Sequence, residues 1–221
     1  MTFSRSIEDY IKAIYELRGA GDRVTSTALA AKLGVTPASV TGMVKRMAHE
    51  RPDLVDYAPH HGVVLTAEGE AIALRIVRRH RLVELFLCTT LGYSWDEVHE
   101  EACKLEHVIS EDFEARISKA LGDPTRDPHG EMIPTADLTM PSDESLPLAS
   151  LRIDETATVK RVSDDDPALL RHLDEIGLIP EARVTVMKFS ELDGNLTLNV
   201  EGQSSNVVLG TAITNRIFVE K

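Results

Sequence analysis

The sequence predicts a mainly α fold with small β parts: an N-terminal winged helix-turn-helix, a helical middle part and a C-terminal β-barrel. Apolar residues recur at helical spacing through the first half of the 221-residue chain, which indicates a series of amphipathic helices. Two short alternating runs joined by a turn follow the third expected helix, as in a wing. Further alternating runs fill the C-terminal part, which is typical of a small barrel.

The first two expected helices are short and have recognisable ends. We expect a helix at residues 6–18, because Ser6 is a suitable N-cap and an apolar stripe follows it. The stretch 19–22 contains two glycines and breaks this helix. A second helix is expected within residues 25–33, closed by Gly34.

The third expected helix has the pattern of a DNA-recognition helix. Thr36 fits an N-cap and Pro37 fits the first helical position. Val40, Val44 and Met47 repeat at helical spacing and are expected to face inward. Small polar residues on the opposite face allow a close approach to base edges, and basic residues reach phosphates. The positions expected to contact DNA are Thr36, Pro37, Ala38, Ser39, Thr41, Gly42, Lys45 and Arg46.

A wing and further helices follow. A helical hairpin in a protein core would give the same helix pattern, but two alternating runs at 54–58 and 63–66 favour the DNA-binding interpretation. Ser94 and Glu97 form a capping-box pattern at the start of one later helix. Later helices are expected at residues 66–91, 95–108 and 110–121. Together they offer enough apolar surface for a dimer interface.

The C-terminal part follows a long polar segment. Residues 123–148 are rich in Pro, Asp, Gly, Ser and Thr, and are expected to form an ordered loop that becomes a linker. One helix is expected at about 167–176. The strands of the barrel are expected at 157–162, 183–187, 196–200, 205–209 and 217–219.

Composition and charge narrow the class of protein. No apolar run is long enough for a transmembrane helix and the N-terminus lacks the apolar core of a secretory signal, so we expect a cytoplasmic protein with no membrane partner. Only Cys88 and Cys103 occur, so a disulfide framework is not expected. Residues 1–80 hold 11 Lys/Arg and 9 Asp/Glu, whereas the rest of the chain holds 13 and 27. This distribution is compatible with an N-terminal nucleic-acid binder despite the net charge of −12.

A run of metal-binding residue types stands out in the middle of the chain. His99, Cys103 and either Glu106 or His107 are three or four residues apart, which places them on one face if the segment is helical. Imidazole, thiolate and carboxylate groups are the donors that bind transition metals. His80 and Glu84 lie one helical turn apart on an earlier stretch. The pattern predicts a metal ion held between packed helices.

Several longer segments resemble the diphtheria toxin repressor family of metal-activated transcriptional repressors. The likeness rests on residues 8–17, 79–84, 98–107, 127–130 and 133–134, and extends over almost the whole chain. It implies a helical metal-binding and dimerisation domain, and a C-terminal SH3-like barrel similar to a small iron-transport accessory domain. The implied division is 1–72 for the winged helix-turn-helix, 73–140 for the helical domain, 141–150 for a linker and 151–221 for the SH3-like domain.

The resemblance implies two metal sites in each subunit. The primary site would use Asp9, Cys103, Glu106 and His107. The ancillary site would use His80, Glu84 and His99, with Asp166 as the nearest carboxylate of the C-terminal domain. A glutamine that the family usually contributes there falls on or near Leu169, which cannot bind a metal.

The same resemblance gives a mixed indication of the metal. Iron-responsive members carry methionine at the position of Asp9, whereas manganese-responsive members carry aspartate; shorter manganese-responsive members carry glutamate at the positions of Lys12 and Cys103. A hard carboxylate favours Mn(II), and a thiolate favours the later metals, unless only the backbone carbonyl of Cys103 binds. We expect Mn(II), with Fe(II) as the alternative and Co(II), Ni(II), Zn(II) or Cd(II) as surrogates.

The implied function is that of a metal-activated repressor of metal-uptake genes. A metal bridging the first helix and the central cluster would fix the recognition helices of a homodimer for binding to double-stranded DNA with an inverted repeat. Three alternatives remain open: a metallohydrolase, a metal-trafficking or storage adaptor, and a repressor whose metal is structural and permanently bound. No catalytic motif such as HExxH or a phosphate-binding loop supports the first alternative.

Overall fold

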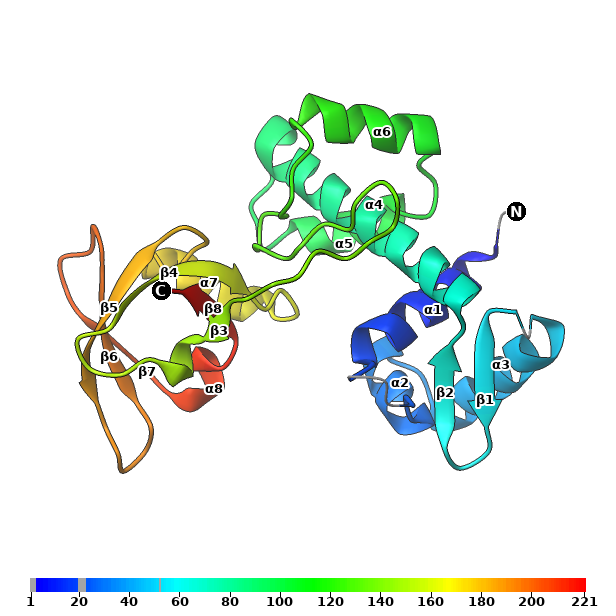
Figure 1. Cartoon of the computed structure of the whole chain (residues 1–221), viewed down its shortest axis with the longest axis horizontal. Helices are drawn as coiled ribbons and strands as arrows, with labels where there is room; N and C mark the ends of the chain where they lie inside the picture. The colour runs from blue at the N-terminus through cyan, green and yellow to red at the C-terminus, as the bar shows by residue number, and fades with distance from the viewer. Residues whose placement is uncertain (1–2, 20–22, 52) are drawn as a thin grey trace. The chain divides into compact units, whose positions relative to one another are not determined.

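A computed structural model describes residues 3–19, 23–51 and 53–221 of the chain. The chain divides into two compact units, and the division falls within one long helix, α4 (Ala67–Leu91) (Figure 1). The first unit consists of Met1–His80, Glu106–Ile109 and Pro134–Met140, and the second of Arg81–Leu105, Ser110–Ile133 and Pro141–Lys221. Each unit therefore collects segments that are far apart in the sequence.

The first unit contains the helix-turn-helix and the wing that the sequence predicts. The side chains of Thr25 and Thr36 accept hydrogen bonds from the backbone amides of Ala28 and Ser39, so both cap their helices. Gly34 closes the second helix in the left-handed conformation (φ +65°), as predicted. Besides the start of α4, the elements are α1 (Arg5–Leu17), α2 (Ser26–Leu33), α3 (Pro37–Glu50), and the antiparallel strands β1 (Val55–Ala58) and β2 (Gly62–Leu65).

The core of this unit confirms the predicted inward face of the third helix. Val40, Val44 and Met47 are all buried, and they pack with Ile11 and Leu29 of the two preceding helices. The other positions named on this helix face outward: Ser39, Gly42, Lys45 and Arg46 are exposed and Thr41 is half-buried. Of the predicted glycine-containing break at 19–22, residues 20–22 lie outside the described residues.

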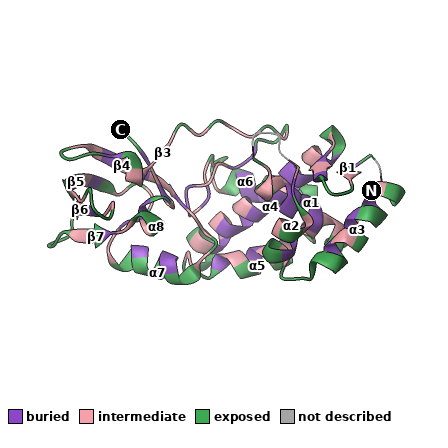
Figure 2. Cartoon of the chain, turned by 90° about the horizontal axis from the view of Figure 1, so that it is seen from below, coloured by how far each residue is buried: buried purple, intermediate pink, exposed green. Residues whose placement is uncertain are grey.

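The second unit combines the end of α4 and several shorter helices with a sheet. Figure 2 shows buried positions recurring along α4 and α5, as expected for amphipathic helices. The six strands pair in the order β3-β8-β4-β5-β6-β7, and every neighbouring pair is antiparallel. The elements after α4 are α5 (Val98–Leu105), α6 (Glu111–Ala120), β3 (Leu146–Pro147), η1 (Leu148–Ser150), β4 (Thr156–Val162), α7 (Pro167–Glu175), β5 (Arg183–Phe189), β6 (Leu196–Val200), β7 (Val207–Leu209), α8 (Thr211–Thr214) and β8 (Ile217–Glu220).

The sheet has its own apolar core. Val159, Val184, Val186 and Leu198 are fully buried between the strands and α7. Leu146–Pro147, within the expected linker, already pairs with β8. This arrangement agrees with the predicted SH3-like C-terminal part, which adds short strands to an otherwise helical protein.

The helix expected at residues 95–108 is shorter than predicted. α5 begins at Val98 and ends at Leu105, and Glu106 and His107 lie in the turn that follows. The capping-box pair still interacts, because Ser94 Oγ donates a hydrogen bond to Glu97 Oε2 at 2.8 Å, but it closes a turn before the helix. Because the helix ends at Leu105, helical spacing no longer determines the direction of Glu106 and His107. Both residues belong to the first unit.

Candidate metal centres and DNA interface

Asp9, Glu106 and His107 converge in the first unit, and we call them the first centre. His107 Nε2 lies 2.9 Å from Asp9 Oδ1 and 3.4 Å from Glu106 Oε1. This nitrogen is buried and makes no hydrogen bond to the described residues. Three donor atoms that approach each other without a shared hydrogen bond fit the ligand set of a divalent cation, which would sit between them.

A carboxylate behind His107 fixes the ring for this role. His107 Nδ1 lies 2.6 Å from Glu8 Oε2, one residue before Asp9 on α1. Because a carboxylate accepts, Nδ1 carries the proton and Nε2 keeps a lone pair directed at the first centre. A carboxylate behind a metal-binding histidine commonly sets the tautomer in this way.

The second oxygen of Glu106 has different partners. Lys12 Nζ donates to Glu106 Oε2 at 2.7 Å, and His80 Nδ1 lies 2.5 Å from the same oxygen. Burial raises the pKa of Glu106, but the hydrogen bond from His80 and the charge of Lys12 outweigh it and lower the pKa to about 2. Glu106 therefore stays ionised at neutral pH although it is buried.

Glu84, Asp127 and His129 form a second cluster, which we call the second centre. All three residues are buried. His129 Nε2 lies 2.7 Å from the backbone carbonyl of Trp95, so this nitrogen donates and Nδ1 keeps the lone pair. Within the described part of the chain, His129 Nδ1 makes no hydrogen bond, and it lies 3.8 Å from Glu84 Oε2. A buried lone pair opposite a buried carboxylate leaves room for a cation between them.

The carboxylate of Asp127 is held in place by the backbone. Its Oδ1 accepts hydrogen bonds from the amides of His129 and Glu131, both at 2.9 Å. Its Oδ2 accepts no hydrogen bond from any residue that the structure describes, and the Nε atom of Arg81 lies 3.7 Å from it. Burial and the charge of Glu84 raise the pKa of Asp127 well above its usual value. Without a cation, the second centre therefore favours a proton on Asp127.

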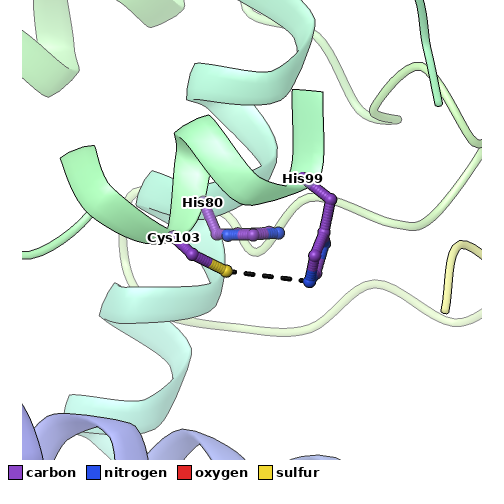
Figure 3. Close-up of side chains that lie close together, drawn as sticks. All are labelled: His80, His99 and Cys103. Carbon is purple, nitrogen blue, oxygen red and sulfur yellow. Dashed lines mark hydrogen bonds between the residues drawn. The ribbon is translucent and has the colours of Figure 1, made fainter. Parts of the chain in front are cut away.

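His99 and Asp164 flank the second centre. His99 Nδ1 lies 3.3 Å from Glu84 Oε1 and 3.8 Å from Asp164 Oδ2, so these three groups also form a potential ligand set. Cys103 Sγ lies 3.7 Å from His99 Nε2, one turn along α5. Figure 3 shows this contact and also draws His80 of α4.

Two predicted ligands, Asp166 and Cys103, contact other groups than the resemblance implied. Asp166 is the N-cap of α7 and accepts hydrogen bonds from the amides of Ala168 and Leu169. Its carboxylate also lies 3.4 Å from Arg216 Nη1. The helix terminus therefore uses the oxygens of Asp166, and Asp164 is the residue that faces His99. Cys103 belongs to the second unit and Asp9 to the first, and the thiol of Cys103 lies beside His99.

Asp127, His129 and Asp164 were not predicted as donors, and Glu8 was not predicted as the partner of His107. Asp127 and His129 lie in a loop, where no helical spacing indicates a shared face. One signal was present: an Asp-Pro-His-Gly turn brings a carboxylate and an imidazole close together. Glu8 directly precedes Asp9, and a carboxylate there was a candidate partner for a metal-binding histidine.

The exposed face of α3 borders a hollow between the helix-turn-helix and the wing. Thr36 and Ser39 interact at the exposed start of this helix, where their hydroxyl oxygens lie 2.9 Å apart. A hollow of about 340 Å³ is open next to Thr41 and Lys45. It is lined by Thr25, Ser26, Thr41, Lys45, Tyr57, Pro59, His60 and Gly62. Hydroxyl and ammonium groups around such a hollow suit contacts to a phosphate backbone.

Known proteins resemble this chain along nearly its whole length. The N-terminal DNA-binding domain of iron-dependent repressors matches residues 2–63, their metal-binding and dimerisation domain matches 66–135, and the FeoA domain matches 146–221. The iron-dependent repressor IdeR of Mycobacterium leprae is 35% identical, covering 97% of this chain and 96% of the relative. The diphtheria toxin repressor of Corynebacterium diphtheriae is 30% identical, covering 95% of both chains.

Solved structures of manganese-dependent regulators are also similar. A manganese-dependent transcriptional repressor in complex with manganese is 39% identical, with a TM-score of 0.87, and the match covers 96% of this chain and 98% of that structure. The manganese regulator SloR is 31% identical, with a TM-score of 0.78 and coverage of 97% and 98%. Iron and manganese regulators thus both occur among the similar proteins.

The fold and these matches define a metal-dependent, DNA-binding transcriptional repressor with a dimerisation domain. The chain belongs to the iron-dependent repressor and diphtheria toxin repressor family. This family consists of transcriptional repressors, so the metallohydrolase alternative is set aside. None of the described helices is both long and apolar enough to cross a membrane.

Proposed function

We propose that this protein is a Mn(II)-activated repressor that controls metal-uptake genes, and that the first centre is its sensing site. The observation that carries the proposal is the buried, non-hydrogen-bonded Nε2 of His107, which meets carboxylate oxygens of Asp9 and Glu106. A divalent cation there supplies positive charge and Lewis acidity. Two hard oxygens and one imidazole suit Mn(II), which prefers oxygen donors.

The residues of the first centre suggest how binding is coupled to DNA. Without positive charge between them, the Asp9 carboxylate and the lone pair of His107 repel each other at 2.9 Å. Asp9 lies on α1, which packs against α2 of the helix-turn-helix and against β2 of the wing. The metal-bound state therefore favours the position of α1 seen here, which is a population shift toward a DNA-competent arrangement.

We propose that the second centre binds a further cation through Glu84, Asp127 and His129, with His99 and Asp164 beside it. Three buried donors, two of them oriented by backbone groups, support this assignment. It revises the predicted ancillary set by replacing Asp166 with Asp164 and adding the two loop residues. Whether His80 and Cys103 act as ligands stays a prediction from the resemblance.

DNA recognition is proposed to follow the pattern of helix-turn-helix dimers. A two-fold homodimer would place one α3 in each of two successive major grooves and so read an inverted repeat. We retain 1–72, 73–140 and 151–221 as the proposed domains, with 141–150 as linker. The proposed contact residues are those named on the exposed side of α3, namely Thr36, Pro37, Ala38, Ser39, Thr41, Gly42, Lys45 and Arg46.

An Fe(II)-dependent repressor is the second candidate function. It is favoured by the names of the curated relatives, which are iron-dependent repressors at 34–35% identity. It is also favoured by the thiol of Cys103 near His99, because a thiolate prefers the later divalent metals. The two candidates differ in which metal activates DNA binding at its physiological free concentration.

DNA binding at controlled free metal concentration tests the proposal. DNA fragments selected with the full-length protein in Mn(II) would be titrated by fluorescence anisotropy in buffered Mn(II), Fe(II), Co(II) and Zn(II). We expect Mn(II) to activate binding at micromolar concentration, and Asp9→Met to shift the preference toward Fe(II) and the later metals. Equal DNA affinity in EDTA would contradict metal activation, and activation by Fe(II) but not Mn(II) would favour the second candidate.

A further inference from the structure

The two oxygens of Glu106 have separate roles. Oε1 faces His107 in the first centre, whereas Oε2 takes both Lys12 and His80. All three residues are buried: 2% of Glu106, 8% of Lys12 and 5% of His80 are exposed. Glu106 thus offers a metal ion at the first centre one oxygen that is not already taken.

A buried lysine beside a metal-binding carboxylate requires an explanation. Removing an ammonium group from water is costly unless a charge partner compensates it. Lys12 has such a partner in Glu106, and it lies on α1 one turn after Asp9. The first centre and its surroundings hold the carboxylates of Glu8, Asp9 and Glu106, so the ammonium of Lys12 cancels part of their negative charge.

We propose that Lys12 is a built-in counter-cation of the first centre, which holds Glu106 Oε2 away from the metal and lowers the affinity for divalent ions. The inference rests on the proposed function of the first centre. Lys12 stabilises the metal-free protein, because it neutralises a buried carboxylate when no metal is present. It opposes metal binding, because two positive charges then share the surroundings of one carboxylate.

This double role makes an unusual prediction for a single substitution. Lys12→Met keeps the aliphatic stem but removes the charge, which leaves Glu106 with less compensation. The melting temperature of the metal-free variant should therefore fall. Its affinity for Mn(II) should rise by roughly tenfold or more, because a repelling charge next to the bound ion has been removed. A lysine that served only the packing of α1 would lower stability without tightening metal binding.

The experiment measures both quantities on the full-length protein. Mn(II) affinity is determined by competition with a fluorescent chelator in the His129→Ala background, so that the first centre dominates, and thermal melts are recorded in EDTA. Lys32→Met is the matched control, because Lys32 is an exposed lysine of the same unit that pairs with Glu16 at 2.8 Å. Lys12→Arg retains the charge and should retain the lower affinity of the parent protein.

The outcomes distinguish a counter-cation role of Lys12 from a purely structural one. Tighter Mn(II) binding with a lower metal-free melting temperature in Lys12→Met, and neither change in Lys32→Met, supports the inference. Unchanged or weaker Mn(II) binding overturns it. If Lys12→Met does not fold, Lys12→Gln is measured in the same way and judged by the same criterion. A parallel His107→Ala arm in the same His129→Ala background separates the premises: Mn(II) binding that survives both changes refutes the first centre itself.

Discussion

The two candidate metal centres differ in how their ligands are held and how water reaches them. In the first centre, the side chain of Asp9 is 40% exposed. The other two ligands are held by side chains: His107 by Glu8, and Glu106 by Lys12 and His80. In the second centre, all three donors are buried, and the backbone orients two of them. An exposed ligand gives an ion a route in and out, whereas a buried set exchanges only when the loop opens.

We therefore expect the two proposed centres to have different tasks. A site that exchanges rapidly follows the free metal concentration, which a sensor requires. A buried site with donors fixed by the backbone is preorganised and retains its ion, which contributes to stability more than to sensing. Four experiments test whether the two centres differ in this way.

Removing one histidine from each centre should separate sensing from stability. His107→Ala removes the imidazole of the first centre, and we expect metal-dependent DNA affinity to fall by roughly a hundredfold or more, since even a change behind a metal ligand costs 10–100-fold. His129→Ala should instead lower the melting temperature of the metal-loaded protein and preserve most of the DNA response. Anisotropy titrations and thermal melts of both variants provide the test. Similar loss of DNA response in both variants would show that the tasks are not divided.

The sequence predicted the first centre better than the second for a physical reason. Asp9, Glu106 and His107 lie in long segments that resemble the family, and these segments identified them even though α5 ends before Glu106. Asp127 and His129 depend on a loop conformation, and Glu84 is distant from them in sequence. The contact between this loop and Glu84 depends on tertiary packing, which local periodicity does not predict.

Asp166 has a competing role that local chemistry indicates. It directly precedes Pro167, and an Asp followed by Pro is a common start of a helix. Its carboxylate caps α7, as that pattern indicates. The cap at Thr36, in contrast, was predicted correctly, because Thr36 precedes a helical pattern and has no competing role. The fold was therefore predictable from caps and periodicity. Which of the neighbouring acidic residues faces His99 was not.

A glycine in the loop of the second centre should be essential for stability. Gly130 has a φ of +87°, and a Cβ there would lie 1.8 Å from the backbone oxygen of Lys160. Gly130→Ala should cost about 3 kcal/mol or more, because strain and the displaced strand both contribute. Gly202→Ala is the matched control with the same φ of +87° but open space around the Cβ, and it should cost about 1 kcal/mol. Urea unfolding measures both, and equal costs would show that the contact with Lys160 is unimportant.

Acid and base should destabilise the metal-free protein through different centres. The pKa of Glu106 falls from 4.5 to about 2 on folding, so its contribution, on the order of 3 kcal/mol, is present above pH 4.5 and is lost as the pH falls through about 2. The pKa of Asp127 is raised on folding, so its favourable contribution is present below 3.8 and is lost as the pH rises through the higher folded value.

Urea unfolding in EDTA across this pH range tests both signs. Glu106→Gln should flatten the acid side of the stability profile, and Asp127→Asn should flatten the side of rising pH. Asp137→Asn is a suitable control, because Asp137 is exposed and bonded to nearby threonines. A profile in which Asp127→Asn alters only the acid side would contradict the opposite behaviour of the two centres.

The smallest effect is expected from the carboxylate behind His107. Glu8→Ala should weaken Mn(II) binding at the first centre by about tenfold, because the ring loses the acceptor that fixes its tautomer. Glu8→Gln keeps an acceptor oxygen without the charge and should fall between the parent and Glu8→Ala. Glu16→Ala, also on α1, removes a carboxylate that pairs with Lys32 and should leave Mn(II) binding unchanged. The second centre has no equivalent variant, since its histidine is oriented by the carbonyl of Trp95. If Glu8→Ala bound Mn(II) as tightly as the parent, the first centre would be as independent of its surrounding side chains as the second, and the contrast between them would fail.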